Sequence, residues 1–187
     1  MAKLIYGFSV SLDGFIEDAR GSLDWSVPDE TLHRHFNERE RSASAALYGR
    51  RLYELMSAYW PTADEDPSAP DVIKEYARIW RSEPKVVFSR TLQSVSHNAR
   101  LVRDVLPAEI ARLKAESAGD LLLGGPGLAL SFMRLGLIDE YWLYIHPVLL
   151  GGGKPMFGPL ERAIDLRLLD TQSFNHGVEL HRYETIR

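Results

Sequence analysis

Three segments of the sequence combine glycine with residues that could hold a phosphate. The first, Gly124-Gly125-Pro126-Gly127, follows an apolar run and opens a predicted helix at Leu128. Small residues let a phosphate approach the backbone, and a helix N-terminus supplies N–H groups and partial positive charge. The same residues also fit a plain strand-to-helix turn. They do not form a Rossmann fingerprint, because no third glycine stands at the required spacing.

The second segment places two arginines directly after a glycine. Arg50 and Arg51 follow Gly49, so both fall in the first turn of a helix that begins where a predicted strand ends. Guanidinium groups are suited to bidentate contacts with phosphate. A solvated, charged helix face is the alternative interpretation of this pair.

The third segment, Gly151-Gly152-Gly153-Lys154, is not a nucleotide-binding P-loop. That pattern requires a glycine five residues before the Gly-Lys pair and a serine or threonine after it. Val148 and Pro155 stand at those positions, so a loop between strands is expected instead. The six histidines show no metal-binding spacing, and we expect no metal site.

Composition narrows the possible classes of protein. The chain has 187 residues, a formal net charge of −4 and no cysteine, which excludes disulfides, thiol catalysis and cysteine-type zinc sites. No basic stripe points to nucleic acid. The most apolar stretch, residues 121–133, contains glycine and proline and is too short to span a bilayer. The N-terminus has no signal-peptide pattern, so we expect a cytoplasmic protein that forms one domain over residues 1–187.

The elements that must position these segments alternate between strands and helices as far as residue 149. Strands are predicted at residues 3–12, 45–48, 85–89, 101–105, 120–123 and 141–149. Helices are predicted at residues 28–42, 50–58, 71–80, 108–117 and 128–135, and residues 15–26 read as irregular. Residues 166–173 and 178–184 alternate like a hairpin. This order predicts an α/β protein with a mostly parallel sheet covered on both faces and an antiparallel C-terminal hairpin.

Taken together, the segments resemble the dihydrofolate reductase fold, in the branch similar to the reductase domain of bacterial riboflavin-biosynthesis deaminase-reductases. The resemblance implies a three-layer α/β/α architecture and covers nearly the whole chain. It is carried, in the family's order, by Val10–Ile16 (VSLDGFI), Leu47–Glu54 (LYGRRLYE), Val86–Arg90 (VVFSR), Leu121–Gly127 (LLLGGPG), Gly136–Glu140 (GLIDE) and His146–Gly153 (HPVLLGGG).

The resemblance implies NADPH as the cofactor. It places the diphosphate at Gly49 and at Gly124, Gly125, Pro126, Gly127 and Leu128, with a cis bond between Gly124 and Gly125. Arg50, Arg51, Ser89 and Arg90 are then expected to hold the adenosine 2′-phosphate. No acidic residue stands between Gly49 and Leu52 to select the 2′-hydroxyl of NADH. Leu52 replaces the family's usual threonine, which removes one hydroxyl contact to the diphosphate.

The resemblance also suggests where the substrate and the nicotinamide lie. Residues 14–25 are expected to border the nicotinamide, and Trp25 is a cofactor-binding candidate. Trp25-Ser26-Val27-Pro28 resembles the Trp-x-x-Pro loop of folate reductases, which carry a substrate-binding carboxylate where Glu30 stands. Asp13 and Glu30 are the catalytic candidates for delivering a proton. Asp13 also fits a turn cap, and Glu30 also fits an acidic residue at a helix N-terminus.

The expected function is therefore that of an NADPH-dependent reductase acting on a small pyrimidine- or pterin-like heterocycle. The best candidate substrate is 5-amino-6-(5-phosphoribosylamino)uracil. Dihydrofolate reductase activity and non-catalytic NADPH binding are the alternatives. A homodimer is expected because the family's reductase domains commonly pair and because residues 141–150 are unusually apolar; a buried central strand would explain that segment equally well.

Overall fold

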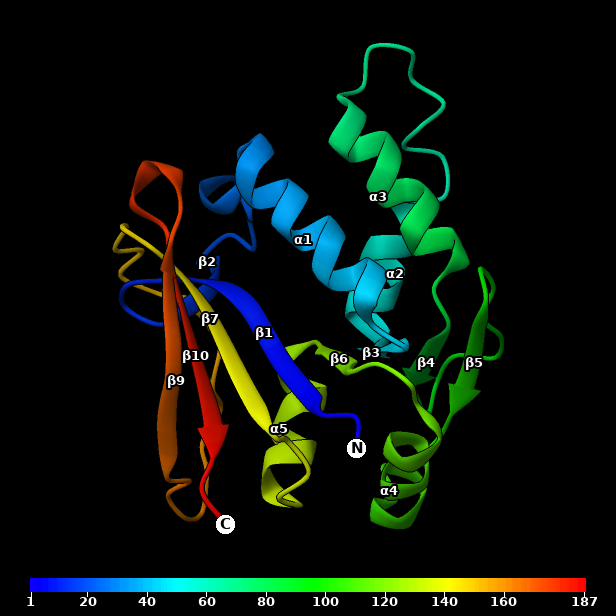
Figure 1. Ribbon diagram of the computed structural model, residues 1–187, viewed down its shortest axis with the longest axis vertical. Coiled ribbons are helices and arrows are strands. Elements are labelled where there is room, and N and C mark those ends of the chain that lie inside the picture. Colours follow the sequence, from blue (N-terminus) through cyan, green and yellow to red (C-terminus); the bar gives the residue numbers. More distant parts are fainter.

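One eight-stranded sheet organises the chain, which a computed structural model describes over residues 1–187 (Figure 1). In order across the sheet, its strands are β5 (Ala99–Val102), β4 (Lys85–Phe88), β3 (Ala45–Gly49), β6 (Leu121–Gly124), β1 (Leu4–Ser11), β7 (Glu140–His146), β10 (Glu179–Thr185) and β9 (Leu166–Ser173). Neighbours from β5 to β7 run parallel, whereas β10 runs antiparallel to both β7 and β9. The predicted mostly parallel sheet and C-terminal hairpin are confirmed.

Helices cover both faces of this sheet. Figure 1 shows α1 (Glu30–Ser42), α2 (Arg50–Tyr59) and α3 (Asp71–Ser82) on one face, and α4 (Pro107–Glu116) and α5 (Pro126–Arg134) on the other. Side chains along a strand alternate between the two faces, so one strand can serve both layers. Tyr141 of β7 packs in one cluster with Phe132 of α5. Tyr144, three residues further along the same strand, packs in another cluster with Leu32 of α1. The three-layer α/β/α prediction is thereby confirmed.

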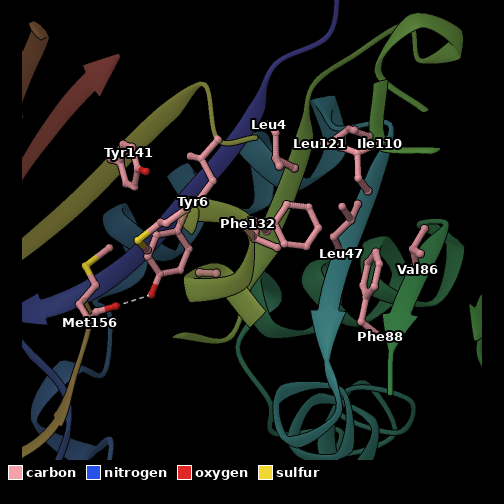
Figure 2. Close-up of a cluster of buried hydrophobic side chains, with 14 of the residues drawn as sticks. Leu4, Tyr6, Leu47, Val86, Phe88, Ile110, Leu121, Phe132, Tyr141 and Met156 are labelled. Atoms are coloured by element: carbon pink, nitrogen blue, oxygen red, sulfur yellow. Dashed lines mark hydrogen bonds between the residues drawn. The ribbon is translucent and has the colours of Figure 1, made fainter. Parts of the chain in front are cut away.

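The largest core cluster lies between the sheet and the helices α4 and α5 (Figure 2). Phe132 is fully buried there and meets the ring of Phe88 edge-on, with centroids 5.6 Å apart. Leu47 and Leu121 from adjacent strands complete the contact surface. Burying each such side chain contributes about 1.5–3 kcal/mol, so this cluster fixes the strand ends that carry the candidate site.

The segment predicted to be irregular contains two short elements. β2 (Phe15–Asp18) pairs antiparallel with β8 (Gly153–Pro155), and a 3₁₀ turn covers Asp24–Ser26. Three residues are too few to show the alternation of apolar and polar residues that predicts a strand, so β8 could not be predicted from the sequence. A Cβ on Gly153 would lie 2.0 Å from the carbonyl oxygen of Glu17, and Gly153 has φ 139°, so the pairing requires glycine here.

Two other boundaries differ from expectation near the glycines. α5 begins at Pro126 rather than Leu128, because proline is preorganised for the first helical position. The predicted strand at residues 141–149 ends at His146, directly before Pro147. The predicted cis bond between Gly124 and Gly125 is wrong, since every peptide bond is trans; the chain turns through Gly125 at φ 98°.

None of the helices combines the length and the apolar composition that a membrane crossing requires.

Candidate functional site

The carboxyl ends of the parallel strands lie along one edge of the sheet, which is where open α/β sheets bind ligands. The sequence-predicted residues follow these ends closely. Asp13 comes after β1, Gly49 ends β3, Ser89 follows β4 and Gly125 follows β6. The fold therefore brings four separate segments of the sequence to one edge.

Gly49 and Gly125 lie next to each other at this edge. Their strands pair in register, with Tyr48 opposite Gly124. A Cβ on Gly125 would stand 3.7 Å from the Gly49 amide nitrogen, and a Cβ on Gly49 would stand 3.4 Å from the Cβ of Leu128. Because neither glycine carries a side chain, backbone atoms form the walls of the site at Gly49 and Gly125, which is called the cradle below.

Two helices begin at this cradle. Gly49 is the N-cap of α2 and Gly125 is the N-cap of α5, and neither helix has a side-chain hydrogen bond at its N-terminus. The first-turn N–H groups of a helix have no partner within the helix, and the helix dipole makes them attractive to anions. Two such N-termini on adjacent strands form a site with the charge and shape to hold a diphosphate.

Pro126, Gly127 and Leu128 form the first turn of α5. A Cβ on Gly127 would meet no atom within 4 Å, so the space beside this turn is open. Leu52 fills the inner side of the cradle, because a Cβ on Gly124 would lie 2.3 Å from the Leu52 Cδ2 atom. The leucine that replaces the family's threonine therefore packs against the glycine turn instead of offering a hydroxyl.

The predicted arginines follow two adjacent strands: Arg50 and Arg51 open α2 directly after β3, and Arg90 comes just after β4. Arg50 and Arg51 are exposed, and the Arg50 guanidinium is 3.9 Å from the carboxylate of Glu54. Arg90 is 80% exposed and donates to Asp104, with an Nε–Oδ1 distance of 3.0 Å. Exposed ion pairs of this kind contribute at most about 1 kcal/mol, so a phosphate can replace Asp104 as the partner of Arg90.

Ser89 holds the turn that follows β4. Its hydroxyl oxygen accepts hydrogen bonds from the backbone N–H groups of Thr91 (3.2 Å) and Leu92 (3.0 Å). Arg103 supports the same turn by donating to the carbonyl oxygens of Ser89 (2.8 Å) and Leu92 (2.6 Å). The role of Arg103 could not be predicted from the sequence, because its contacts join the ends of two different strands.

Asp13 anchors the third glycine segment. Its carboxylate accepts hydrogen bonds from the Ser11 hydroxyl (2.6 Å) and from the backbone N–H groups of Leu150 (3.1 Å) and Gly151 (2.7 Å). The Ser11 hydroxyl, followed by these N–H groups, lowers the pKa of Asp13. Asp13 is thus an ionised group that ties the β1–β2 turn to the loop before β8, which favours an anchoring role over proton delivery.

Glu30 and its neighbour Asp29 face different surroundings. The Glu30 side chain is 71% exposed and pairs with Arg34 at 2.5 Å. Asp29 is the N-cap of α1: it accepts from the Leu32 backbone N–H through Oδ1 and from the Asn175 side-chain amide through Oδ2, each at 2.8 Å. The carboxylate that faces a cavity is therefore Asp29, one residue before the predicted Glu30.

That cavity has a volume of about 240 Å³ and lies between the N-terminus of α1, the end of β7 and the β9–β10 turn. Trp25 and His146 form one wall, with ring centroids 5.4 Å apart and planes at 83°. The Trp25 indole Nε1 and the His146 imidazole Nε2 are both buried without a hydrogen-bond partner. Burial lowers the pKa of His146, so its imidazole is neutral at physiological pH.

The sequence-predicted residues thus divide between two neighbouring regions of one edge. The cradle holds Gly49, Gly124, Gly125, Pro126, Gly127 and Leu128. Arg50 and Arg51 open the helix that starts at Gly49, and Ser89 and Arg90 follow the neighbouring strand β4. Trp25 lies instead in the wall of the cavity beside β7. Asp29, His146 and Asn175 line this cavity and were missed, although Asp29 could have been recognised as a residue type that caps helices.

Comparison with known proteins identifies the family of this chain. Residues 2–180 match the family described as the RibD C-terminal domain. YyaP, an uncharacterized protein of Bacillus subtilis (strain 168), is 36% identical over 177 residues, which cover 94% of this chain and 91% of YyaP. The riboflavin biosynthesis protein RibD of Mycobacterium tuberculosis (strain ATCC 25618 / H37Rv) is 27% identical over 164 residues, which cover 81% of this chain and 44% of RibD.

A solved structure shows the same architecture over the full length. A crystal structure from Shewanella sp. PV-4, of a protein assigned to riboflavin biosynthesis, is 29% identical and covers 100% of both chains with a TM-score of 0.76. The match of residues 2–180 spans far more than half of the sequence. The chain therefore belongs to the RibD C-terminal domain family.

Proposed function

We propose that this protein is an NADPH-dependent reductase of a small pyrimidine- or pterin-like heterocycle. The observation that carries the proposal is the meeting of two uncapped helix N-termini at Gly49 and Gly125, with exposed arginines beside them. A backbone-walled cradle of this kind suits a diphosphate, and an adjacent guanidinium suits a further phosphate. NADPH carries both groups, whereas NADH lacks the further phosphate.

The chain's own residues suggest how such a cofactor would be held. Gly49 and residues 124–128 would bind the diphosphate, and Arg50, Arg51 and Arg90 would bind the 2′-phosphate beside the turn formed by Ser89. The nicotinamide would then extend along the strand ends toward Trp25. When bound, NADPH supplies the hydride, and the protein aligns the reacting groups and excludes water.

The family supports a substrate from riboflavin biosynthesis, with 5-amino-6-(5-phosphoribosylamino)uracil as the starting candidate. RibD and the Shewanella protein are both described as riboflavin biosynthesis proteins. Asp13 would position the loop at Leu150 and Gly151 near the reacting groups rather than donate a proton, because its carboxylate is held in the ionised form. Glu30 would have no catalytic role, because its side chain faces solvent.

The Arg50→Ala substitution tests the cofactor assignment. A charge-assisted hydrogen bond contributes about 1.5–3 kcal/mol, so we expect NADPH to bind roughly 10- to 100-fold more weakly while NADH affinity stays unchanged. Titration with each cofactor, followed by nicotinamide fluorescence, measures both affinities. Arg112→Ala, on the opposite face of the sheet, is the matched control. Equal losses for NADPH and NADH would remove Arg50 from the 2′-phosphate site.

Turnover separates a reductase from a protein that only binds NADPH. Oxidation of NADPH can be followed by absorbance with 5-amino-6-(5-phosphoribosylamino)uracil and with dihydrofolate as substrates. Turnover of either compound supports the reductase and ranks the two substrates. Tight NADPH binding without turnover on either would favour the non-catalytic alternative.

A further inference from the structure

We propose that Asp104 competes with the cofactor's 2′-phosphate for Arg90, so that it selectively weakens NADPH binding and narrows the preference for NADPH over NADH. The proposal rests on the proposed function and adds a residue that sets its cofactor specificity. The sequence has no acidic residue between Gly49 and Leu52 that would favour NADH. The fold instead brings a carboxylate to Arg90 from the end of β5, a separate segment of the chain.

The register of the strands explains how Asp104 reaches this place. Gly49 lies opposite Phe88 of β4, and Phe88 lies opposite Val102 of β5. Neighbouring strands are about 4.8 Å apart, so the residues that follow β4 and β5 leave the sheet side by side. Arg90 and Asp104 each stand two residues beyond the last pair, and their side chains meet there.

The turn that carries Arg90 is held by the same two strand ends. The Ser89 backbone N–H donates to the carbonyl oxygen of Val102 at 3.0 Å, and Arg103 donates to the carbonyl oxygen of Ser89 at 2.8 Å. Ser89 itself is buried. Because the backbone on both sides of the ion pair is fixed in this way, Asp104 stays within reach of Arg90.

Arg90 is more fully occupied than Arg50. Its Nε and Nη2 atoms both donate to one oxygen of Asp104, Oδ1, with an Nε–Oδ1 distance of 3.0 Å. The pair of Arg50 with Glu54 is longer, at 3.9 Å. Nε and Nη2 form an edge of the guanidinium that can hold a phosphate through two parallel hydrogen bonds. A 2′-phosphate can therefore take this edge only when Asp104 leaves it.

The charges explain why the competition affects NADPH alone. A phosphate monoester carries a charge of about −1.5 to −2 at pH 7, whereas the 2′-hydroxyl of NADH is neutral. A phosphate that replaces Asp104 on Arg90 leaves the carboxylate unpaired beside it. Two like charges about 4 Å apart in water change an affinity by roughly fivefold. The 2′-hydroxyl has no such cost, because it leaves the pair of Arg90 and Asp104 intact.

Two other positive groups near this pair do not remove the competition. Arg103 donates through Nη1 to the carbonyl oxygens of Ser89 and Leu92, so it holds the turn and forms no ion pair with Asp104. α4 begins at Pro107, and the dipole at its N-terminus attracts a carboxylate and a phosphate alike. Neither group releases Arg90 from Asp104.

Fluorescence titration of the full-length protein with NADPH and with NADH tests the proposal in the Asp104→Asn variant. We expect this variant to bind NADPH about 5-fold more tightly and NADH with unchanged affinity. Asp170→Asn is the matched control: Asp170 is 53% exposed, compared with 50% for Asp104, and it pairs with Arg182 at the antiparallel end of the sheet. The control should leave both affinities unchanged.

The Arg90→Ala background shows whether Asp104 acts through Arg90. In that background Asp104→Asn should raise NADPH affinity by clearly less than it does in the wild type, because there is no guanidinium left to release. The proposal is overturned if Asp104→Asn leaves NADPH affinity unchanged, or if it shifts both cofactors equally. The same gain with and without Arg90, or an equal gain from Asp170→Asn, would overturn it as well.

The wild-type titrations separate this inference from the proposed function. If neither cofactor binds, the proposed function fails and this inference fails with it. If NADPH binds and its affinity does not respond to Asp104→Asn, the inference alone fails. Urea denaturation shows whether each variant is folded, and Asp104→Ser provides a second variant without the charge.

Discussion

At the scale of single residues, two glycines that lie two positions apart have different roles. Gly125 adopts φ 98°, a conformation that side chains strongly disfavour, and it packs against the backbone of Gly49. Gly127 lies in the first turn of α5 beside open space. Gly125 is therefore required by the fold, whereas Gly127 is the position from which a side chain would obstruct an approaching ligand.

Alanine at these two positions should separate the roles. Gly125→Ala should lower the free energy of unfolding by about 1–3 kcal/mol, because alanine must adopt a strained backbone conformation. Gly127→Ala should leave stability unchanged or raise it by up to about 1 kcal/mol, since alanine favours helix. Urea denaturation measures both, and an equal effect of the two substitutions would refute this distinction.

The residues of the site differ in how far the sequence could predict them. The Gly-rich turns, the arginine pair and the N-terminus of α1 are local patterns, so their positions could be read directly. The Asp29–Asn175 contact joins residues 146 positions apart, and it depends on the β9–β10 turn reaching α1. Such a contact follows from packing alone, whereas the prediction of Glu30 rests on its position after the Trp25-Ser26-Val27-Pro28 segment.

At the scale of elements, a pair of buried carboxyl groups lies where α1 meets the junction of α3 and β4. Glu40 and Glu83 are 7% and 6% exposed, and both Glu83 carboxyl oxygens lack partners. Burial, and then the charge of Glu40, raises the pKa of Glu83 to about 9, while Lys85 and Arg39 oppose the shift. Glu83 is thus protonated at neutral pH in the folded protein and ionised in the unfolded chain.

This difference predicts a pH-dependent stability that Glu83→Gln should remove. The folded state retains a proton that the unfolded state has lost, so wild-type stability should fall as pH rises toward 9, by up to about 1.4 kcal/mol per pH unit. Urea denaturation between pH 7 and 8 precedes most of the loss of the proton from Lys85, whose pKa burial lowers to about 8. The variant should show a flatter profile; an unchanged slope would exclude Glu83 as its source.

Most helices and strands could be predicted from the sequence, because each is long enough to show the spacing of apolar residues typical of its kind. α3 places Val72, Tyr76 and Trp80 on one buried face, which is the spacing expected of a helix against a sheet. β8 has three residues, and it depends on the positive φ of Gly153, which cannot be deduced from the sequence. The order of strands in the sheet is likewise a property of the assembled layers and not of any single segment.

At the scale of the whole molecule, the sheet ends at β5 on its parallel side and in an open edge at β9 on its antiparallel side. The apolar segment at residues 141–150 does not form that edge, because β7 lies between β1 and β10; the buried-strand interpretation of it is therefore the correct one. β9 is the edge strand, and all eight of its residues are exposed, including Leu166, Leu168 and Leu169. An edge strand with exposed leucines is a surface suited to pairing with another chain.

We propose that the protein forms a homodimer through β9, and the Leu168→Lys substitution tests this. Leu168 is 51% exposed, and a lysine there would place a charge in the apolar contact while leaving the folded chain intact. Light scattering after size exclusion should give twice the chain mass of 21.2 kDa for the wild type and a shift to the monomer for the variant. Leu106→Lys, at a 55% exposed leucine just before α4, should leave the dimer unchanged. A wild-type protein that remains monomeric, or equal dissociation by both substitutions, would contradict the assignment of β9.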